Sequence, residues 1–247
     1  MSDVSEYAHD YVYPPVVAGL LATFKLLGLK LRVEGAHHVP HSGPAVMASN
    51  HISHLDFIFV GLGARQSRRY VRFMAKESIF ANRMAGPLMR GMHHIPVDRD
   101  AGMASYKAAL EALKKGEVVG VFPEATISQS FVVKDFKTGS ARMAAVTGVP
   151  LVPVALWGTQ RLWTKGRKRS LTKRHVPITI HVGEPMHPTR KDDQAGVLAE
   201  LRSRIGALVD KAQREYPAQP SGPDDRWWLP AHLGGTAPEP PGLATAP

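Results

Sequence analysis

The sequence contains no cysteine, and this absence excludes disulfide bonds, thiolate metal sites and catalysis by a cysteine nucleophile. A chain without cysteine fits a reducing compartment such as the cytoplasm. Acidic residues are also few: 21 Asp and Glu stand against 31 Lys and Arg, which gives a formal net charge of +10. This excess predicts an anionic partner. Nucleic acid, an anionic membrane face and a phosphorylated substrate all fit it, and so does an inert basic surface.

The sequence also lacks a long hydrophobic run. Its longest apolar stretch, residues 14–29, is interrupted by Lys25 and is shorter than the ~20 apolar residues that span a bilayer. The residues before it are polar and slightly acidic, which does not fit a secretory signal peptide. Apolar side chains recur at helical spacing within the stretch and predict an amphipathic helix. Such a helix either lies in the membrane interface or packs onto the domain.

The remaining pattern alternates strands with helices. Strands are expected at 31–34, 45–49, 71–75, 94–97, 118–122, 151–156 and 178–182, and helices at 55–62, 78–89, 104–115, 141–147 and 195–216. Several of these strands are apolar throughout, as buried parallel strands are. The pattern predicts an α/β fold: a single domain, residues 30–216, with a largely parallel mixed sheet flanked by helices.

The two ends of the chain are expected to lie outside this domain. Residues 1–29 form an N-terminal segment that contains the amphipathic helix. Residues 217–247 are rich in Pro, Gly and Ala and predict a flexible tail. Within this tail, the adjacent Trp227 and Trp228 either anchor at a membrane interface or pack against the domain.

Three polar residues follow directly after predicted strands: His51, Asp98 and Glu124. Because chemistry in parallel sheets collects where strands end, we expect them to line one edge. His51 can accept a proton from a hydroxyl, and Asp56 can fix its tautomer. The pair works best if His51 lies in the loop and Asp56 in the first helical turn, with Ser53 as the N-cap. The spacing alone is a weak signal.

Four segments in a fixed order strengthen it: residues 50–56 (NHISHLD), 95–99 (IPVDR), 121–126 (VFPEAT) and 149–154 (VPLVPV). Together they resemble the blocks of the glycerophospholipid acyltransferases, notably the 1-acyl-glycerol-3-phosphate acyltransferases. The resemblance covers about residues 30–190. It implies that an O-acyltransferase carries a fatty acyl group from a thioester to the hydroxyl of lysophosphatidic acid, giving phosphatidic acid for phospholipid biosynthesis.

The resemblance also implies the roles of individual residues. His51 acts as the base and Asp56 holds its ring, while backbone amides at the start of the following helix stabilise the oxyanion. Substrate contacts fall on six residues: Asn50, Ser53, Arg99, Glu124, Thr126 and Lys137. Arg99 is the first choice for the acceptor phosphate. Glu124 holds the acceptor or organises its loop, with support from Thr126.

The sequence departs from the family pattern FPEGTRS at two positions. Ala125 replaces the glycine, and Ile127 replaces an arginine. A phosphate-binding cation is therefore missing. Either Arg99 and Lys137, the latter in a stretch that resembles the family's FKxG, cover the phosphate, or the acceptor differs. Glycerol 3-phosphate, another lysophospholipid and a glycolipid remain alternatives.

The other expectations concern partners. No cofactor and no metal are expected, and the donor is acyl-CoA or acyl-ACP; a zinc site at His51, His54 and Asp56 is the weaker hypothesis. The basic run 161–174, beside Trp157 and Trp163, fits docking to an anionic membrane, contact with coenzyme A phosphates, or RNA binding. The expected location is the cytoplasmic face of the cell membrane, peripheral or monotopic. A basic lipid- or nucleic-acid-binding protein is the alternative from another class. Acyl chain length, sn-position and oligomeric state are left open.

Overall fold

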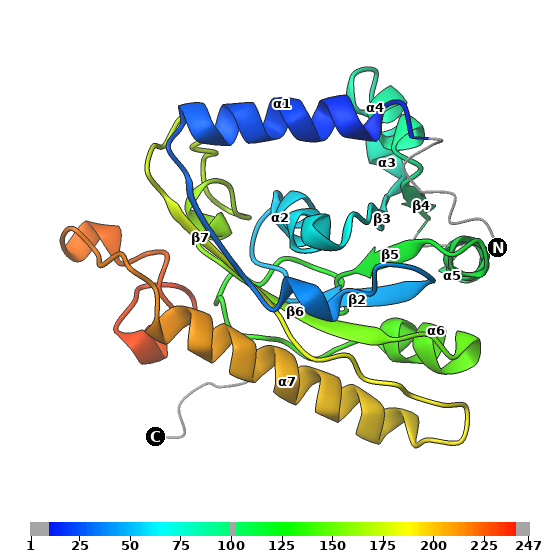
Figure 1. The fold of residues 1–247 in the computed structure, drawn as a ribbon. Coiled ribbons are helices and arrows are strands. Elements are labelled where there is room, and N and C mark those ends of the chain that lie inside the picture. The colour runs from blue at the N-terminus through cyan, green and yellow to red at the C-terminus, as the bar shows by residue number, and fades with distance from the viewer. Residues whose placement is uncertain (1–9, 99–101, 241–247) are drawn as a thin grey trace.

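The computed structural model describes residues 10–98 and 102–240, and Figure 1 shows their arrangement. In this part of the chain one seven-stranded sheet has the order β1-β7-β6-β2-β5-β3-β4. The strands are β1 (Lys30–Glu34), β2 (Ala45–Ser49), β3 (Val71–Lys76), β4 (Ile95–Val97), β5 (Val118–Val121), β6 (Leu151–Trp157) and β7 (Pro177–Val182). Neighbouring strands are parallel except for the β6–β7 pair. The predicted largely parallel mixed sheet is confirmed.

Helices cover both faces of the sheet. One face carries α1 (Tyr13–Leu26) and α2 (Asp56–Gly63), and the other carries α5 (Gly102–Lys114), α6 (Gly139–Thr147) and α7 (Gln194–Arg214). The two short helices α3 (Glu77–Phe80) and α4 (Ala85–Gly91) follow β3. A single helix was expected over 78–89. The chain breaks there because the Asn82 side chain accepts the Met84 and Ala85 amides at 3.0 Å each, which starts α4 anew.

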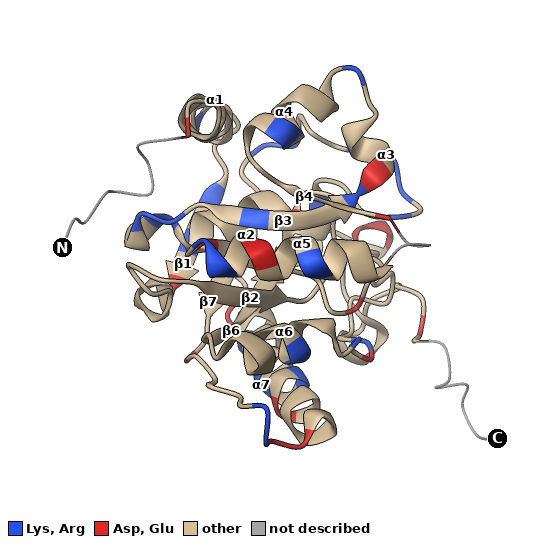
Figure 2. Cartoon of the chain, turned by 90° about the vertical axis from the view of Figure 1, so that its right-hand side faces the viewer, with Lys and Arg blue, Asp and Glu red and all other residues tan. Residues whose placement is uncertain are grey.

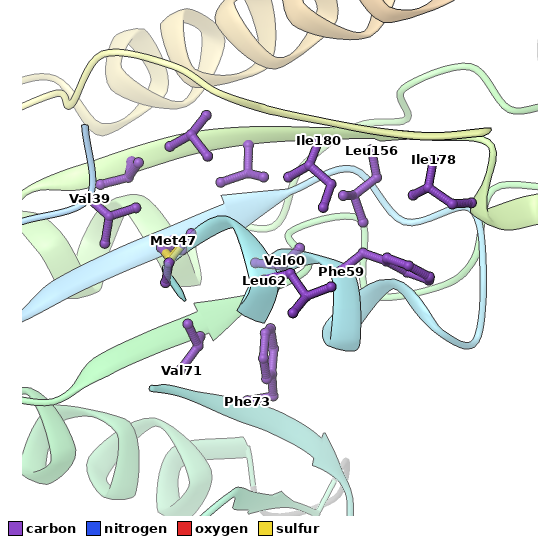
Figure 3. Close-up of a cluster of buried hydrophobic side chains, with 14 of the residues drawn as sticks. Val39, Met47, Phe59, Val60, Leu62, Val71, Phe73, Leu156, Ile178 and Ile180 are labelled. Carbon is purple, nitrogen blue, oxygen red and sulfur yellow. The ribbon is translucent and has the colours of Figure 1, made fainter. Parts of the chain in front are cut away.

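Each face of the sheet has its own apolar core. Under α2, strand residues such as Met47 and Ile180 pack against Phe59 and Val60, all of them at most 1% exposed (Figure 3). The alternate residues of the same strands, Val46 among them, pack against α5, α6 and α7. Successive side chains of a strand point to opposite faces, so strands buried on both sides must be apolar throughout. The runs 45–48 and 151–156 meet that requirement, which makes these strands recognisable in the sequence.

The N-terminal helix α1 packs onto the domain along one side. Phe24 stacks on Phe59 of α2 with ring centroids 5.2 Å apart. Tyr13 donates a hydrogen bond to the Val71 carbonyl at 3.0 Å, and Asp10, just before the helix, forms a buried ion pair with Arg72 at 2.7 Å. The opposite side of α1 is exposed. None of the helices in the described residues combines the length and the apolar character of a membrane span.

The C-terminal segment corrects one expectation. Trp228, Pro230 and Ala237 are buried against the domain, so the flexible tail predicted for 217–247 does not describe this part of the segment, whereas most other residues of 217–240 are exposed. Trp228 is fully buried, with Tyr216 and Trp157 in the same cluster. The Arg161 guanidinium lies 4.4 Å from the Trp228 ring centroid. Of the two roles left open for Trp228, packing against the domain is the one observed. The residue composition does not reveal this packing, because one buried tryptophan can hold a segment that is otherwise poor in apolar residues.

Candidate active site

Two adjacent strands deliver the central residues. His51 follows β2 and Glu124 follows β5, and these strands are parallel neighbours. The His51 amide donates to the Glu124 carboxylate at 2.8 Å, and the His51 carbonyl accepts from the Ser128 amide at 2.7 Å. The strand-end expectation is thus met for His51 and Glu124. Asp98 follows β4, the outermost strand, where its amide donates to the Ser105 hydroxyl at 3.2 Å.

His51 and Asp56 are hydrogen-bonded as the sequence suggested. His51 lies in the loop after β2 and Asp56 opens α2, and the His51 Nδ1 is 3.0 Å from Asp56 Oδ2. An ionised carboxylate only accepts hydrogen bonds, so Nδ1 carries the proton and Nε2 presents a lone pair. No hydrogen bond within the described residues occupies Nε2. The ring is 19% exposed whereas the Asp56 side chain is 0% exposed, so the imidazole is accessible from outside and the carboxylate is not.

The Asp56 carboxylate collects four donors. Besides the His51 ring, Oδ2 accepts the Ile52 and Ser53 amides at 2.7 Å each. Oδ1 accepts the Thr159 hydroxyl at 2.6 Å. The Ile52 and Ser53 amides are therefore committed to Asp56 and are not free for an oxyanion. They stabilise the buried charge that orients His51 instead. That amides at the start of the following helix stabilise the oxyanion stays a prediction.

A row of aromatic rings leads from His51 to an apolar cavity. The His51 ring stacks on Phe122 with centroids 4.2 Å apart, Phe122 stacks on Phe73 at 6.1 Å, and Phe73 meets Phe57 edge to face at 6.0 Å. Phe57 lines a cavity of about 250 Å³ between α1, α2 and α4, whose walls are almost entirely apolar. Its other lining residues include Val16, Val17, Leu20, Ile58, Leu88 and Met89. The His51 ring is therefore joined to the cavity wall by a row of packed aromatic side chains.

Glu124 organises the loop beside His51. Its carboxylate accepts the His51 amide and, at 3.3 Å, the Lys134 amide, and the residue is 5% exposed. Burial raises the pKa of the Glu124 carboxyl to about 7, and the two amides offset this in part. Of the two roles given to Glu124, organising the loop is the one its contacts support. Thr126 belongs to the same loop, where the Lys134 ammonium holds its carbonyl at 2.7 Å and its hydroxyl at 2.6 Å.

Two cations, Arg99 and Lys137, are predicted to contact the acceptor phosphate, and the structure describes only one of them. Arg99 lies outside the described residues. Lys137 is exposed on the loop that follows Glu124, where its amide donates to the Pro123 carbonyl at 2.8 Å. Lys134, which was not predicted from the sequence, lies in the same loop. Burial lowers the pKa of its ammonium, the Glu124 carboxylate offsets this in part, and the nearby Lys165 cation lowers it further.

Asn50 and Ser53 have structural roles, which corrects the substrate contacts predicted for them. The Asn50 side chain exchanges two hydrogen bonds with the Leu156 backbone, at 2.8 and 3.0 Å, and ties the end of β2 to β6. The Ser53 hydroxyl donates to the Trp163 carbonyl at 2.6 Å and accepts the Leu55 amide at 3.1 Å. Both residues are at most 1% exposed. Ser53 is also not the N-cap of α2, since that position is Leu55.

The two departures from the family pattern, Ala125 and Ile127, differ in their structural consequences. Ala125 has φ = 59°, a left-handed conformation that glycine adopts freely and alanine adopts only with strain. The backbone of this loop therefore keeps the shape that a glycine would allow. Ile127 is half-buried in the same loop and supplies no charge.

Two further hypotheses from the sequence can be compared with the coordinates. Within the described residues, Glu34, His181 and Glu215 are the one group of three spaced as metal ligands, and Arg32 and Lys211 already pair with these carboxylates. The zinc hypothesis at His51 and Asp56 gains no support from this grouping.

The basic run is partly used inside the protein. Arg161 stacks on Trp228, and Arg167 lies 4.3 Å from the Trp227 ring centroid. Trp157 is fully buried in β6, so it does not reach a membrane interface.

The comparisons with known proteins decide the family. The sequence matches the acyltransferase family over residues 30–157, slightly more than half of the chain. This chain belongs to the acyltransferase family. The predicted resemblance is confirmed.

Relatives within the acyltransferase family carry a more specific name. A chloroplastic 1-acyl-sn-glycerol-3-phosphate acyltransferase of Arabidopsis thaliana is 34% identical over 73% of this chain, and the match spans about half (49%) of that relative. The Bacillus subtilis 1-acyl-sn-glycerol-3-phosphate acyltransferase is 29% identical over 73% of this chain and 89% of its own length. The crystal structure of PlsC, the 1-acyl-sn-glycerophosphate acyltransferase of Thermotoga maritima, has the same fold: its TM-score is 0.71 at 24% identity, over 88% of this chain and 86% of that one.

Proposed function

We propose that this acyltransferase moves a fatty acyl group from an acyl thioester to the free hydroxyl of lysophosphatidic acid, giving phosphatidic acid. The observation that carries the proposal is the His51–Asp56 pair, in which a buried carboxylate fixes Nδ1 and leaves Nε2 open. The names of the relatives support the acceptor.

The chemistry needs one base and no acyl-enzyme intermediate. His51 Nε2 takes the proton of the acceptor hydroxyl as its oxygen attacks the thioester carbonyl. The tetrahedral intermediate then collapses with cleavage of the carbon–sulfur bond. The leaving thiolate receives the proton from the imidazolium, which the Asp56 carboxylate has stabilised meanwhile. The neutral base is restored, and no serine or cysteine nucleophile is needed.

The apolar cavity between α1, α2 and α4 supports a fatty acyl substrate. It holds hydrocarbon out of water, and Phe57, Phe73 and Phe122 connect it to the base. We place the hydrocarbon chain in this cavity, with its carbonyl end directed toward His51. The donor head, coenzyme A or acyl carrier protein, and the acceptor phosphate would then lie on the polar side. There Lys137 and Lys165 are exposed, and Arg99 completes the set of cations proposed for the phosphate.

The proposal is tested by supplying purified protein with acyl-CoA or acyl-ACP and a panel of acceptors, then identifying the acylated lipid by mass spectrometry. The panel contains lysophosphatidic acid, glycerol 3-phosphate, lysophosphatidylcholine and a glycolipid. We expect phosphatidic acid as the main product. A different main product would replace the acceptor but keep the reaction, and the missing cation at Ile127 makes this the second candidate. Failure with every acceptor would contradict the enzyme proposal, and tighter binding to RNA than to anionic vesicles would then favour the binding-protein alternative.

We propose that the protein acts at the cytoplasmic face of an anionic membrane. Two elements support the membrane association. The outer side of α1 is exposed and apolar apart from Thr23 and Lys25. The turn between α3 and α4 presents Met84, which is 84% exposed. Both elements lie on the same side of the molecule in Figure 1 and in Figure 2, and both line the apolar cavity or adjoin it.

Charge in this region has the sign that an anionic leaflet attracts. Residues 76–91 hold three cations, Lys76, Arg83 and Arg90, and a single acid, Glu77 (Figure 2). Each Lys or Arg near such a surface contributes about 1 kcal/mol of attraction. An exposed apolar side chain among these cations suits the headgroup boundary, so the α3–α4 turn and α1 together form the proposed membrane face.

Met84→Asp is expected to weaken binding to vesicles that contain phosphatidylglycerol by about 10-fold, because it removes an apolar side chain from the interface and adds a repelled charge. Co-sedimentation measures this. The control is Met103→Asp: Met103 is 61% exposed on α5, which packs on the opposite face of the sheet. Equal losses from both variants would show that the α3–α4 turn is not the membrane face.

A further inference from the structure

A short segment after β6 is hydrogen-bonded to the loop that carries His51 and Asp56. It comprises residues 158–164, which lie about one hundred residues further along the chain. The Thr164 hydroxyl donates to the Ile52 carbonyl at 2.7 Å, and the Trp163 carbonyl accepts the Ser53 hydroxyl at 2.6 Å and the His54 amide at 3.1 Å. All of these contacts hold the backbone or side chains around the catalytic pair.

One contact from this segment reaches the catalytic carboxylate itself. The Thr159 hydroxyl donates to Asp56 Oδ1 at 2.6 Å, and both residues are 0% exposed. The other three donors to Asp56 all go to Oδ2. Within the described residues Thr159 is therefore the one hydrogen-bond donor to Oδ1. It fixes the rotation of the carboxylate about its Cβ–Cγ bond, and that rotation decides whether Oδ2 faces the His51 ring.

We infer that Thr159 is a positioning residue for acyl transfer: its hydroxyl orients the Asp56 carboxylate and thereby holds His51 with Nε2 toward the reactants. The inference rests on the proposed function and adds a residue to it. Thr159 does not touch the reacting atoms and acts only through Asp56.

The backbone before Thr159 is shaped for this contact. Gly158 has φ = 97°, and a Cβ there would come within 2.2 Å of the Pro177 carbonyl oxygen. Only glycine lets the chain turn at the end of β6 so tightly. The Gly158 amide is held by the Gln160 side chain at 2.9 Å, and Gln160 in turn donates to the Trp228 carbonyl at 3.1 Å. The hydroxyl is therefore presented by a rigid turn rather than by a mobile loop.

The test compares two substitutions that separate shape from hydrogen bonding. Thr159→Val keeps the shape and loses the donor, while Thr159→Ser keeps the donor and loses a methyl group. We expect Val to lower kcat by about 10- to 100-fold, the range that corresponds to losing a hydrogen bond to a charged group, with KM nearly unchanged. Ser is expected to stay within about 3-fold of the parent. Thermal melts show whether both variants remain folded at the assay temperature.

A matched control removes a different hydrogen bond of the same segment. Thr164→Val loses the bond to the Ile52 carbonyl but leaves Asp56 untouched. If Thr164→Val lowers kcat as much as Thr159→Val, the packing of the segment matters and the contact with the carboxylate does not. That result, or full activity of Thr159→Val, would overturn the inference.

A second measurement does not depend on turnover. The ¹⁵N chemical shifts of the His51 ring in the resting protein report which nitrogen carries the proton. We expect the Nδ1–H tautomer in the parent and in Thr159→Ser, and a mixture of tautomers in Thr159→Val. An unchanged ring spectrum in Thr159→Val would contradict the positioning role even if no acceptor of the panel is acylated. Failure of the proposed function alone would instead appear as a parent protein without activity.

Discussion

Replacing His51 with alanine is expected to lower the rate of acyl transfer by about 10²- to 10⁴-fold, the contribution that a positioned general base makes. The Nε2 of the His51 imidazole has no hydrogen bond within the described residues and lies beside the row of aromatic rings. The methyl group of alanine cannot take the hydroxyl proton. The effect should fall on kcat, because the apolar cavity and the cations proposed to bind the substrates are left intact. Initial rates with radiolabelled acyl-CoA measure it.

The matched control is His54→Ala. His54 lies three residues away, and its ring contacts Trp163 with centroids 4.7 Å apart. The His54→Ala variant loses an imidazole from the same loop but keeps the His51–Asp56 hydrogen bond. Its rate of acyl transfer should therefore stay within about 3-fold of the parent. A His51→Ala variant that is folded and keeps a tenth or more of the activity would exclude His51 as the base.

Much of this site could be predicted because its parts are local in sequence. His51 and Asp56 are five residues apart, and a strand followed by a helix suffices to bring them together. Strand β2 has the predicted bounds, Ala45–Ser49, and its first four residues are apolar, as a strand buried on both faces requires. The rule that chemistry follows strand ends also found Glu124, one strand away from His51.

The contacts that were missed join distant parts of the chain. Thr159 and Asp56 are 103 residues apart, and only the β2–β6 pairing brings them together. The sequence does contain a signal for Thr159, since it follows the end of β6 just as His51 follows the end of β2. Asn50 and Ser53 were assigned to substrate from the motif, but a motif records that a residue is needed and not what it touches.

The C-terminal segment shows a different limit. Composition describes the average of a segment, and residues 217–240 are indeed rich in Pro and Gly. Their position is set by Trp228, whose burial depends on a cluster formed by β6, α7 and Arg161. Nothing near Trp228 in the sequence identifies these partners. The largest stability effect predicted for this protein therefore falls on a residue whose surroundings gave no sign of a core.

Trp228→Ala is expected to lower the free energy of unfolding by about 3–5 kcal/mol, the usual effect of truncating a buried tryptophan. The side chain is 0% exposed, and its loss leaves a cavity beside Tyr216 and removes the cation–π partner of Arg161. Chemical denaturation followed by circular dichroism measures the change. Activity should fall as well, because the Trp228 carbonyl holds Gln160, which braces the turn that presents Thr159.

Two controls separate packing from other roles of this tryptophan. Among the described residues the Trp228 Nε1 has no hydrogen-bond partner, so Trp228→Phe loses no hydrogen bond and should cost about 1 kcal/mol or less. Trp227→Ala removes the half-buried neighbour that contacts Arg167 and should cost no more than that. If Trp228→Ala instead keeps the parent stability and loses vesicle binding, Trp228 anchors the membrane and does not lock the segment. We expect the loss of stability, because the Trp228 ring is buried and stacked against the Arg161 guanidinium. Insertion of this ring into lipid would break that contact.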